Sequence, residues 1–201
     1  MQFTRDHFSN NIQRWNRHAK PYFEDKKKIN ILIVGVDEGR APHWLFENIM
    51  KKNKAIKIHC IDTWENSEDY TRFLNNMSKY EDQIVHYNVK DYREGILMIP
   101  KSVKFDFLFI DDISAKIVME SLVLAFPLVK GKGLIIVDDY TNSREHLHNC
   151  PKAAVDAFFN VYAPFVKALE FSWQAIFLKR SKPLPWKQCN SEYYHEDISK
   201  I

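Results

Sequence analysis

Ile29-Asn30-Ile31-Leu32-Ile33-Val34-Gly35-Val36-Asp37-Glu38-Gly39 is the stretch that narrows the fold most. Residues 29–34 form an almost continuous apolar run, which is typical of a strand buried on both faces of a parallel sheet. Gly35 allows the chain to turn sharply, and residues 41–52, with Pro42 in their first turn, have the spacing of an amphipathic helix. The stretch therefore predicts a buried strand, a tight loop and a helix, in that order.

The same alternation continues along the chain. Apolar runs predict four more strands, at residues 56–61, 83–88, 105–110 and 133–137. Helical spacing predicts helices at residues 68–78, 92–99, 115–128 and 151–162. Another amphipathic helix, over residues 3–19, precedes the first strand and is expected to end at Pro21.

Two final strands, at residues 166–171 and 174–179, have a connection too short for a crossover, so they must run antiparallel. Strands alternating with helices indicate a mostly parallel sheet with helices on both faces. We therefore expect an α/β fold in one domain over residues 1–180, followed by a polar and aromatic tail at 181–201. The tail carries aromatic residues that could dock on a second copy in a homodimer, and the alternative is a disordered tail.

Composition sets the broad class of protein. The 201 residues are 45% hydrophobic and carry a net charge of +3, which argues against disorder and gives no basic patch for nucleic acid or a membrane surface. The three cysteines, Cys60, Cys150 and Cys189, include no CxxC pair, so neither a disulfide framework nor a zinc site is indicated. We find no signal peptide and no apolar run of membrane-spanning length, and we expect a cytoplasmic protein.

Acidic residues follow nearly every predicted strand, and ligands in open α/β sheets bind beyond the carboxyl ends of the strands. The first loop reads Gly-x-x-x-Gly and carries two acidic residues, which would repel the pyrophosphate of a dinucleotide but tolerate an amine or a sulfonium. Asp62 could accept hydrogen bonds from two ribose hydroxyls, and Trp64 could cover an adenine. The alternative interpretation is a bare strand-to-helix turn with a solvated acidic rim.

Several stretches resemble one known family. The loop GVDEGRA (residues 35–41) is similar to GSFEGRS, and IDTWENS (residues 61–67) is similar to IDTWEGS, both found in family 24 of the class I methyltransferases, a group of small-molecule and sugar O-methyltransferases. Residues 134–140, 151–158 and 6–12 are similar as well, so the resemblance covers roughly residues 3–180. It implies a Rossmann-like sheet in the order 3-2-1-4-5-7-6, with the seventh strand antiparallel.

The resemblance also implies the cofactor, S-adenosylmethionine, and the residues that would bind it. These are Gly35, Val36, Asp37, Glu38, Gly39, Arg40, Asp62, Thr63, Trp64 and Asp111. Within this set, the glycine loop would line the methionine part, Asp62 would hold the ribose, and Thr63 and Trp64 would lie beside the adenosine.

Related O-methyltransferases often bind a divalent metal through carboxylates after the fourth and fifth strands. Here these would be Asp111, Asp138 and Asp139, hard oxygen ligands that suit Mg²⁺ and could hold an acceptor hydroxyl near the methyl group. Asp111 is also the predicted catalytic residue. The alternative for Asp138 and Asp139 is a strand-end pair that caps the next segment.

One position departs from the family pattern. Members often read Asp-Gly-Ser-His after the fourth strand, where the histidine is a candidate base, whereas this chain has Ser114 as the last of the four. Ser114 cannot act as a base near neutral pH. His146 and His148 are possible substitutes, although each is better explained as a solvated loop residue. His86 and Cys60 lie inside predicted strands and are expected to be structural.

The sequence therefore predicts methyl transfer from S-adenosylmethionine to a hydroxyl of a small molecule or sugar. A second hypothesis, prompted by Ser114, is a weak or inactive cofactor-binding protein of the same fold. A third, a nicotinamide-dependent oxidoreductase, is disfavoured by the glycine spacing.

Overall fold

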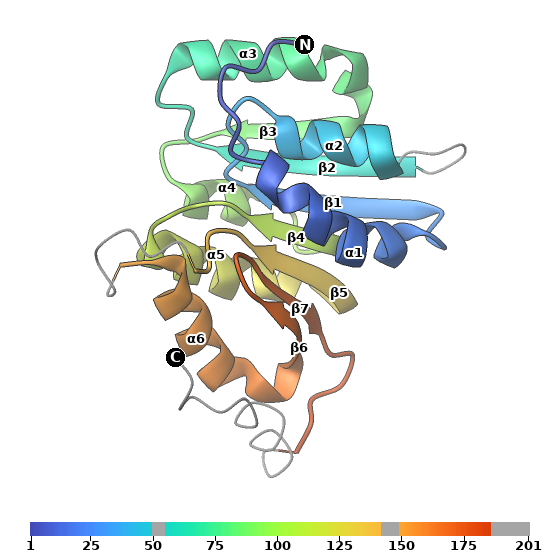
Figure 1. Cartoon of the computed structure of the whole chain (residues 1–201), viewed down its shortest axis with the longest axis vertical. Helices are drawn as coiled ribbons and strands as arrows, with labels where there is room; N and C mark the ends of the chain where they lie inside the picture. Colours follow the sequence, from blue (N-terminus) through green and yellow to red (C-terminus); the bar gives the residue numbers. More distant parts are fainter. Residues whose placement is uncertain (50–54, 142–148, 186–201) are drawn as a thin grey trace.

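The computed structural model describes residues 1–49, 55–141 and 149–185 of the chain. One seven-stranded sheet runs through it in the order β3-β2-β1-β4-β5-β7-β6 (Figure 1). Strands β1 to β5 pair in parallel, and β7 is antiparallel to both β5 and β6. The predicted class, order and antiparallel strand are confirmed.

The bounds of the elements follow the chain order. The strands are β1 (Lys28–Val34), β2 (Ala55–Asp62), β3 (Ile84–Asn88), β4 (Phe105–Ile110), β5 (Val129–Val137), β6 (Val166–Phe171) and β7 (Ala175–Lys179). The α-helices are α1 (Ile12–Phe23), α2 (Arg40–Ile49), α3 (Ser67–Met77), α4 (Tyr92–Met98), α5 (Ala115–Ala125) and α6 (Pro151–Tyr162).

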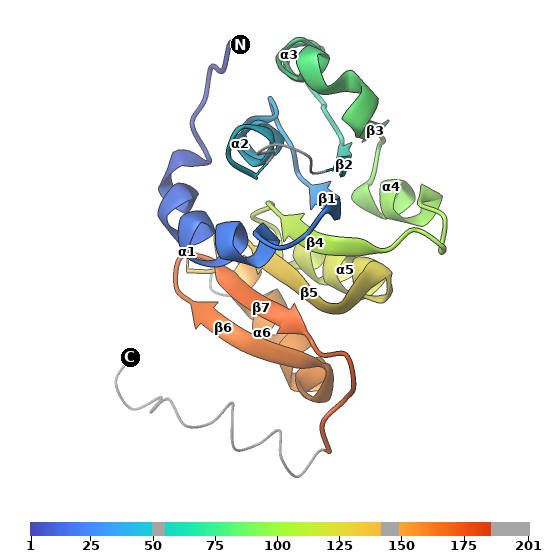
Figure 2. The same cartoon turned by 90° about the vertical axis from the view of Figure 1, so that its right-hand side faces the viewer.

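Helices cover both faces of the sheet (Figures 1 and 2), and one apolar core lies on each face. On one face α1, α2 and α3 bury aromatic side chains, among them Trp15, which packs edge-on against Phe107 and Phe109 of β4. On the other face α4, α5 and α6 cover the sheet, and Phe158 and Phe159 are both almost fully buried. All six residues of β4 are buried, as expected for a central strand with helices on both sides.

The strand register aligns the carboxyl ends of the central strands. Val34 pairs with Ile61 on one side and with Ile110 on the other, and Ile110 pairs with Val137. The residues that follow continue the ladder, because the amide of Gly35 donates to Ile61 and the amide of Asp111 donates to Val34, both at 2.9 Å. The loops after β1, β2, β4 and β5 therefore meet along one edge.

The N-terminal part differs from the sequence prediction. The helix begins at Ile12 instead of residue 3 and passes through Pro21 to Phe23. Phe23 is fully buried against Phe107, and the hydroxyl of Tyr22 donates to the carbonyl of Asp106 at 2.9 Å. These contacts hold the last helical turn in place although proline removes one backbone donor. Residues 2–8, which we call the N-terminal segment, run instead toward the loop after β1.

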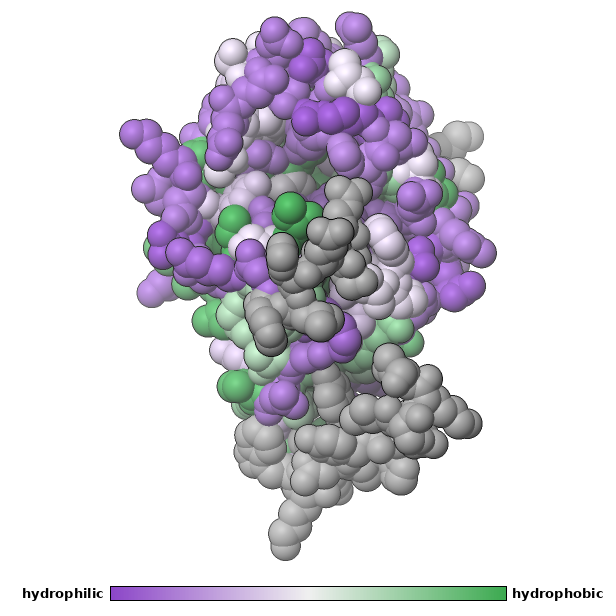
Figure 3. Space-filling view, turned by 60° about the vertical axis from the view of Figure 1, so that its left-hand side comes forward, coloured by the Kyte–Doolittle hydropathy of each residue, from purple (hydrophilic) through white to green (hydrophobic). Residues whose placement is uncertain are grey.

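No helix among the described residues is long and apolar enough to span a membrane. Hydrophilic residues predominate over the upper part of the described surface in Figure 3. The start of the predicted tail is described to Pro185, and the amide of Leu184 donates to the carbonyl of Pro164 at 2.8 Å. The aromatic residues of the tail lie outside the described residues, and the domain boundary at residue 180 stays a prediction.

Candidate functional site

The loop after β1 has the geometry that its glycines allow. Gly35 has a φ of 81°, and a Cβ placed on it would lie 2.0 Å from the carbonyl oxygen of Asp111. Asp37 and Gly39 also have positive φ angles, of 52° and 91°. Three left-handed residues within five positions fold the loop tightly between β1 and α2, so its backbone lies open to a ligand at the strand edge.

Asp62 holds this loop in place. Its Oδ2 accepts hydrogen bonds from the amides of Val36 and Asp37, at 2.6 and 2.8 Å, and its Oδ1 accepts one from the amide of Trp64 at 3.0 Å. A carboxylate accepts about four hydrogen bonds, so Asp62 keeps capacity on Oδ1 for a further donor. The residue predicted to bind ribose is thus also the group that fixes the loop beside it.

Trp64 holds the loop through a hydrogen bond and packs against neighbouring aromatic rings. It adopts a φ of 34°, its indole nitrogen donates to the carbonyl of Asp37 at 2.8 Å, and its ring packs against Tyr70 and Phe73. Only 6% of its surface is exposed. These contacts already occupy much of the ring that was expected to cover an adenine, and that contact stays a prediction.

Glu38 and Arg40 point toward the N-terminal segment. The buried carboxylate of Glu38 accepts hydrogen bonds from the amide and hydroxyl of Thr4 and pairs with Arg72 at 2.8 Å. Burial opposes the charge of Glu38, but the bonds from Thr4 outweigh it and lower the pKa of the carboxyl. Arg40 donates to the carbonyl of Arg5. A direct contact of either side chain with a cofactor stays a prediction.

A cleft of about 790 Å³ opens at this edge of the sheet. Of the predicted site residues it is lined by Gly35, Asp37, Asp62, Thr63, Trp64, Asp111 and Asp139. Residues that sequence reasoning did not place in the site line it too, including Arg5, His7 and Asn10 of the N-terminal part. The similarity of residues 6–12 to the family could have indicated His7 and Asn10, whereas Arg5 lies outside that stretch.

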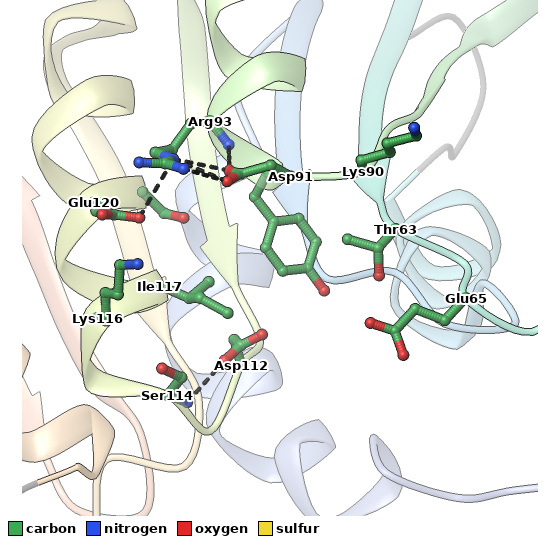
Figure 4. A pocket seen from close by; sticks show the side chains of 12 residues that line it. Thr63, Glu65, Lys90, Asp91, Arg93, Asp112, Ser114, Lys116, Ile117 and Glu120 are labelled. Atoms are coloured by element: carbon green, nitrogen blue, oxygen red, sulfur yellow. Dashed lines mark hydrogen bonds and ion pairs between the residues drawn. The ribbon is translucent and has the colours of Figure 1, made fainter.

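A second cavity of about 340 Å³ adjoins the cleft and shares Thr63, Glu65, Tyr92 and Asp112 with it. Figure 4 shows Thr63 and Glu65 on one side of this cavity, with Asp112, Ile117 and Lys116 across from them. Ser121 also lines it, and its Oγ is buried without a hydrogen-bond partner among the described residues. A buried hydroxyl without a partner is costly unless a ligand or water satisfies it.

Carboxylates dominate the electrostatics at the strand ends. Burial, followed by the charges of Asp138, Asp139 and Asp112, raises the pKa of Asp111 well above its usual range. Burial also raises the pKa of Asp138 to about 6. Like charges that crowd a desolvated site favour binding of a positively charged group.

Asp138 is held apart from the cleft. Only 2% of it is exposed, and its two carboxylate oxygens accept hydrogen bonds from the side-chain amides of Asn11 and Gln174. Among the described residues, no group of three or more His, Cys, Asp or Glu side chains is arranged to hold a metal ion. The predicted magnesium site of Asp111, Asp138 and Asp139 therefore gains no support from the described geometry.

The other candidate residues are placed as follows. Cys60 is buried in the core, and His86 contacts Tyr70 through a 3.0 Å hydrogen bond, in keeping with structural roles. Ser114 precedes α5, and its amide donates to Asp112 at 2.7 Å. His146 and His148 lie outside the described residues.

Comparison with known proteins places this chain in a family. The sequence model of a methyltransferase domain, methyltransferase family 24, matches residues 32–140, which include the glycine loop, Asp62, Asp111 and Asp139. The chain belongs to this methyltransferase family. The resemblance in sequence is thereby confirmed, and the chain is a class I methyltransferase that depends on S-adenosylmethionine. The nicotinamide alternative finds no support.

Solved structures of methyltransferases share the fold. An O-methyltransferase from Bacillus cereus, in complex with SAH, superposes with a TM-score of 0.66 and 16% identity, covering 89% of this chain and 84% of that one. The O-methyltransferase TomG from Streptomyces achromogenes, in complex with SAM, gives 0.63 and 17%, covering 84% and 80%. No curated protein matches this methyltransferase by sequence.

The fold alone does not select the acceptor. The fibrillarin pre-rRNA processing protein of Methanococcus jannaschii superposes with a TM-score of 0.53 and 14% identity, covering 79% of this chain and 69% of that one. Proteins with different functions thus share this fold. The acceptor of this methyltransferase is determined by the residues of its own cleft.

Proposed function

We propose that this methyltransferase moves a methyl group from S-adenosylmethionine to a hydroxyl oxygen of a small molecule or sugar. The observation that carries the proposal is the convergence of Gly35, Asp62 and Asp111 at one edge of the sheet, where they line a single cleft. Two strand-end loops and one fixed carboxylate thus converge where this fold binds its ligands.

The residues present fit the cofactor. The orphaned Oγ of Ser121 and the side chain of Tyr92 in the smaller cavity offer polar and aromatic contacts for an adenosine. Asp62 has room on Oδ1 for a ribose hydroxyl. The loop of Gly35 and Asp37 would lie along the methionine part, and the carboxylate of Asp111 would face its positive charges.

The acceptor would lie in the rest of the large cleft. Asn10, Ile113, Asp139 and Trp173 line it apart from the cofactor residues, and they come from four different segments of the chain. Ile113 lines the cleft and is 70% exposed, so its apolar side chain is accessible to a bound molecule. The mixture of apolar and hydrogen-bonding groups matches a small polyhydroxylated or aromatic acceptor better than a nucleic acid, because basic residues are scarce there.

Transfer requires alignment and the removal of one proton. When bound, the cofactor supplies a methyl group on a sulfonium. The cleft would hold the acceptor oxygen in line with this carbon, and proximity of this kind is worth several orders of magnitude in rate. Asp111 would take the hydroxyl proton as a carboxylate, and the burial and neighbouring acidic charges that raise its pKa make that carboxylate a stronger base than an exposed aspartate. His7 is the described histidine that lines the same cleft.

No step of the proposal runs through a metal ion. Asp138, one of the three predicted ligands, is turned to Asn11 and Gln174, and the described carboxylates do not form a metal-binding group. We include magnesium in the test, because it was predicted from the family resemblance.

The test is a transfer assay with isotope-labelled S-adenosylmethionine and a panel of hydroxylated acceptors, with and without magnesium. We expect labelled product with at least one acceptor, and Asp111→Asn is expected to lower turnover about 100-fold or more while cofactor binding weakens much less, because Asp111 is one of several acidic residues that line the cleft. Asp156→Asn is the matched control, because Asp156 pairs with Lys152 on α6 and does not line the cleft. Binding of the cofactor without transfer to any acceptor would favour the inactive cofactor-binding alternative.

A further inference from the structure

The cleft has an unbalanced charge that bears on how a cofactor is recognised. Eight Asp and Glu residues line it, whereas Arg5 is the one Lys or Arg among its described lining residues. The methionine part of S-adenosylmethionine carries an ammonium and a carboxylate. Acidic side chains can receive the ammonium, but the same side chains repel the carboxylate. A positively charged group at the glycine loop would offset this repulsion and bind the carboxylate.

Arg5 lies beside that loop. Its Nη2 contacts Oδ1 of Asp37 at 2.7 Å and Oδ2 of Asp69 at 2.6 Å. Neither Nε nor Nη1 donates a hydrogen bond to a described residue, so three of its five N–H groups are free. The side chain is 46% exposed at the cleft.

The backbone around Arg5 is fixed by its own contacts. Thr4 is bound to the buried carboxylate of Glu38, and the carbonyl of Arg5 accepts a hydrogen bond from Arg40 at the start of α2. Glu38 and Arg40 belong to the same loop and helix that carry Gly35. The guanidinium is thereby positioned relative to the loop by short connections, as recognition of a ligand requires.

We propose that Arg5 binds the methionine carboxylate of S-adenosylmethionine through its free N–H groups, while Asp37, paired with Arg5, faces the neighbouring ammonium. The proposal rests on the proposed function, because it needs the cofactor in this cleft. Arg5 lies outside residues 32–140, so the family match does not assign it a role. A planar guanidinium can bind a carboxylate through two parallel hydrogen bonds, which a point charge cannot.

This arrangement makes the N-terminal segment a selectivity element. A ligand that lacks the carboxylate would leave Arg5 paired only with Asp37 and Asp69 and would gain nothing from it. The methyltransferase should therefore bind S-adenosylmethionine more tightly than decarboxylated S-adenosylmethionine, although the second ligand carries more positive charge and enters an acidic cleft.

The experiment is calorimetric titration of the full chain with these two ligands and with S-adenosylhomocysteine. Arg5→Gln should weaken binding of the two carboxylate-bearing ligands about 10- to 100-fold and leave binding of the decarboxylated ligand within about threefold. Arg5→Lys should give an intermediate loss, because the charge remains but the fork is lost. Arg17→Gln is the matched control, since it removes the same charge from α1, where Arg17 pairs with Glu170.

The possible results distinguish a failure of the proposed function from a failure of the proposed role of Arg5. If the unaltered chain binds neither S-adenosylmethionine nor S-adenosylhomocysteine, the proposed function itself is overturned. If it binds them and Arg5→Gln binds them equally well, only the role of Arg5 is overturned. Equal weakening of all three ligands in a folded Arg5→Gln variant would show that Arg5 merely supports the loop, and would also overturn the proposal.

Discussion

Asp62 has a second role in the site that its position in the sequence did not indicate. The strand-end aspartate was predicted to bind ribose hydroxyls, and the structure shows that it also accepts three backbone amides from the loops after β1 and β2. Sequence spacing could identify the carboxylate and the loop, but it could not show that the amides of Val36 and Asp37 turn toward the carboxylate. That orientation depends on the positive φ of Gly35 and Asp37.

Gly35 provides a direct test of this loop geometry. Gly35→Ala adds a Cβ that would lie 2.0 Å from the carbonyl oxygen of Asp111, at a φ that alanine disfavours. We expect the free energy of unfolding to fall by about 3 kcal/mol or more, measured by chemical denaturation. Gly131→Ala is the milder comparison, because its nearest neighbour is the hydroxyl of Ser181 and no positive φ is required there. Equal losses in the two variants would contradict the geometry described for the loop.

His59 predicts how stability depends on pH. Burial on β2, and then the charge of Lys57, lowers the pKa of His59 from 6.5 to about 4. Between these values the unfolded chain binds a proton that the folded chain does not, so stability is lost as the pH falls from 6.5 toward 4. The buried carboxylates of Asp111 and Asp138 act in the opposite direction in this range, so a difference between two proteins has to be measured.

His59→Gln removes the histidine contribution and leaves those carboxylates unchanged. The free energy of unfolding of the variant should therefore fall less between pH 7 and pH 5 than that of the unaltered chain, by about 1–2 kcal/mol. Glutamine can still bond to Tyr87, which contacts His59 at 3.1 Å. The same change with pH in both proteins would show that His59 is not desolvated as described.

At the level of secondary structure, the strands were predictable because buried strands consist of runs of apolar residues. The predicted 105–110 is β4 without change, and helix α3 begins after Asn66, whose side chain accepts the amide of Glu68 as an N-cap. Strand β5 begins four residues early, at Val129, because Val129 pairs with Phe105 of β4; the register then shifts before Leu134 pairs with Phe107.

The N-terminal part could not be predicted from its pattern. Phe3 and Phe8 have helical spacing with the residues of α1, yet they precede the helix, because residues 2–8 gain hydrogen bonds to Glu38 and Asn76 on other elements. Such contacts join residues more than 30 positions apart, and no local pattern encodes them. The same contacts bring Arg5 and His7 to the cleft.

At the scale of the whole molecule, the topology follows from the alternation of strands and helices and from one short connection. The connection between β6 and β7 forces an antiparallel pair, and β7 inserts between β5 and β6 in the sheet. This sheet aligns the ends of β1, β2, β4 and β5, and so the acidic residues after each strand form one electrostatic unit. Acidic residues that are far apart in the sequence thus lie together and can bind a positively charged cofactor.

Calorimetric titration of the full chain with S-adenosylmethionine and S-adenosylhomocysteine, with NAD as the reference ligand, measures whether this edge of the sheet binds such a cofactor. We expect both sulfur nucleosides to bind at one site, NAD not to bind, and Asp62→Ala to weaken both sulfur nucleosides at least about tenfold, because it removes a ribose acceptor and releases the loop. Absence of binding by both sulfur nucleosides to the unaltered, folded chain would contradict the account.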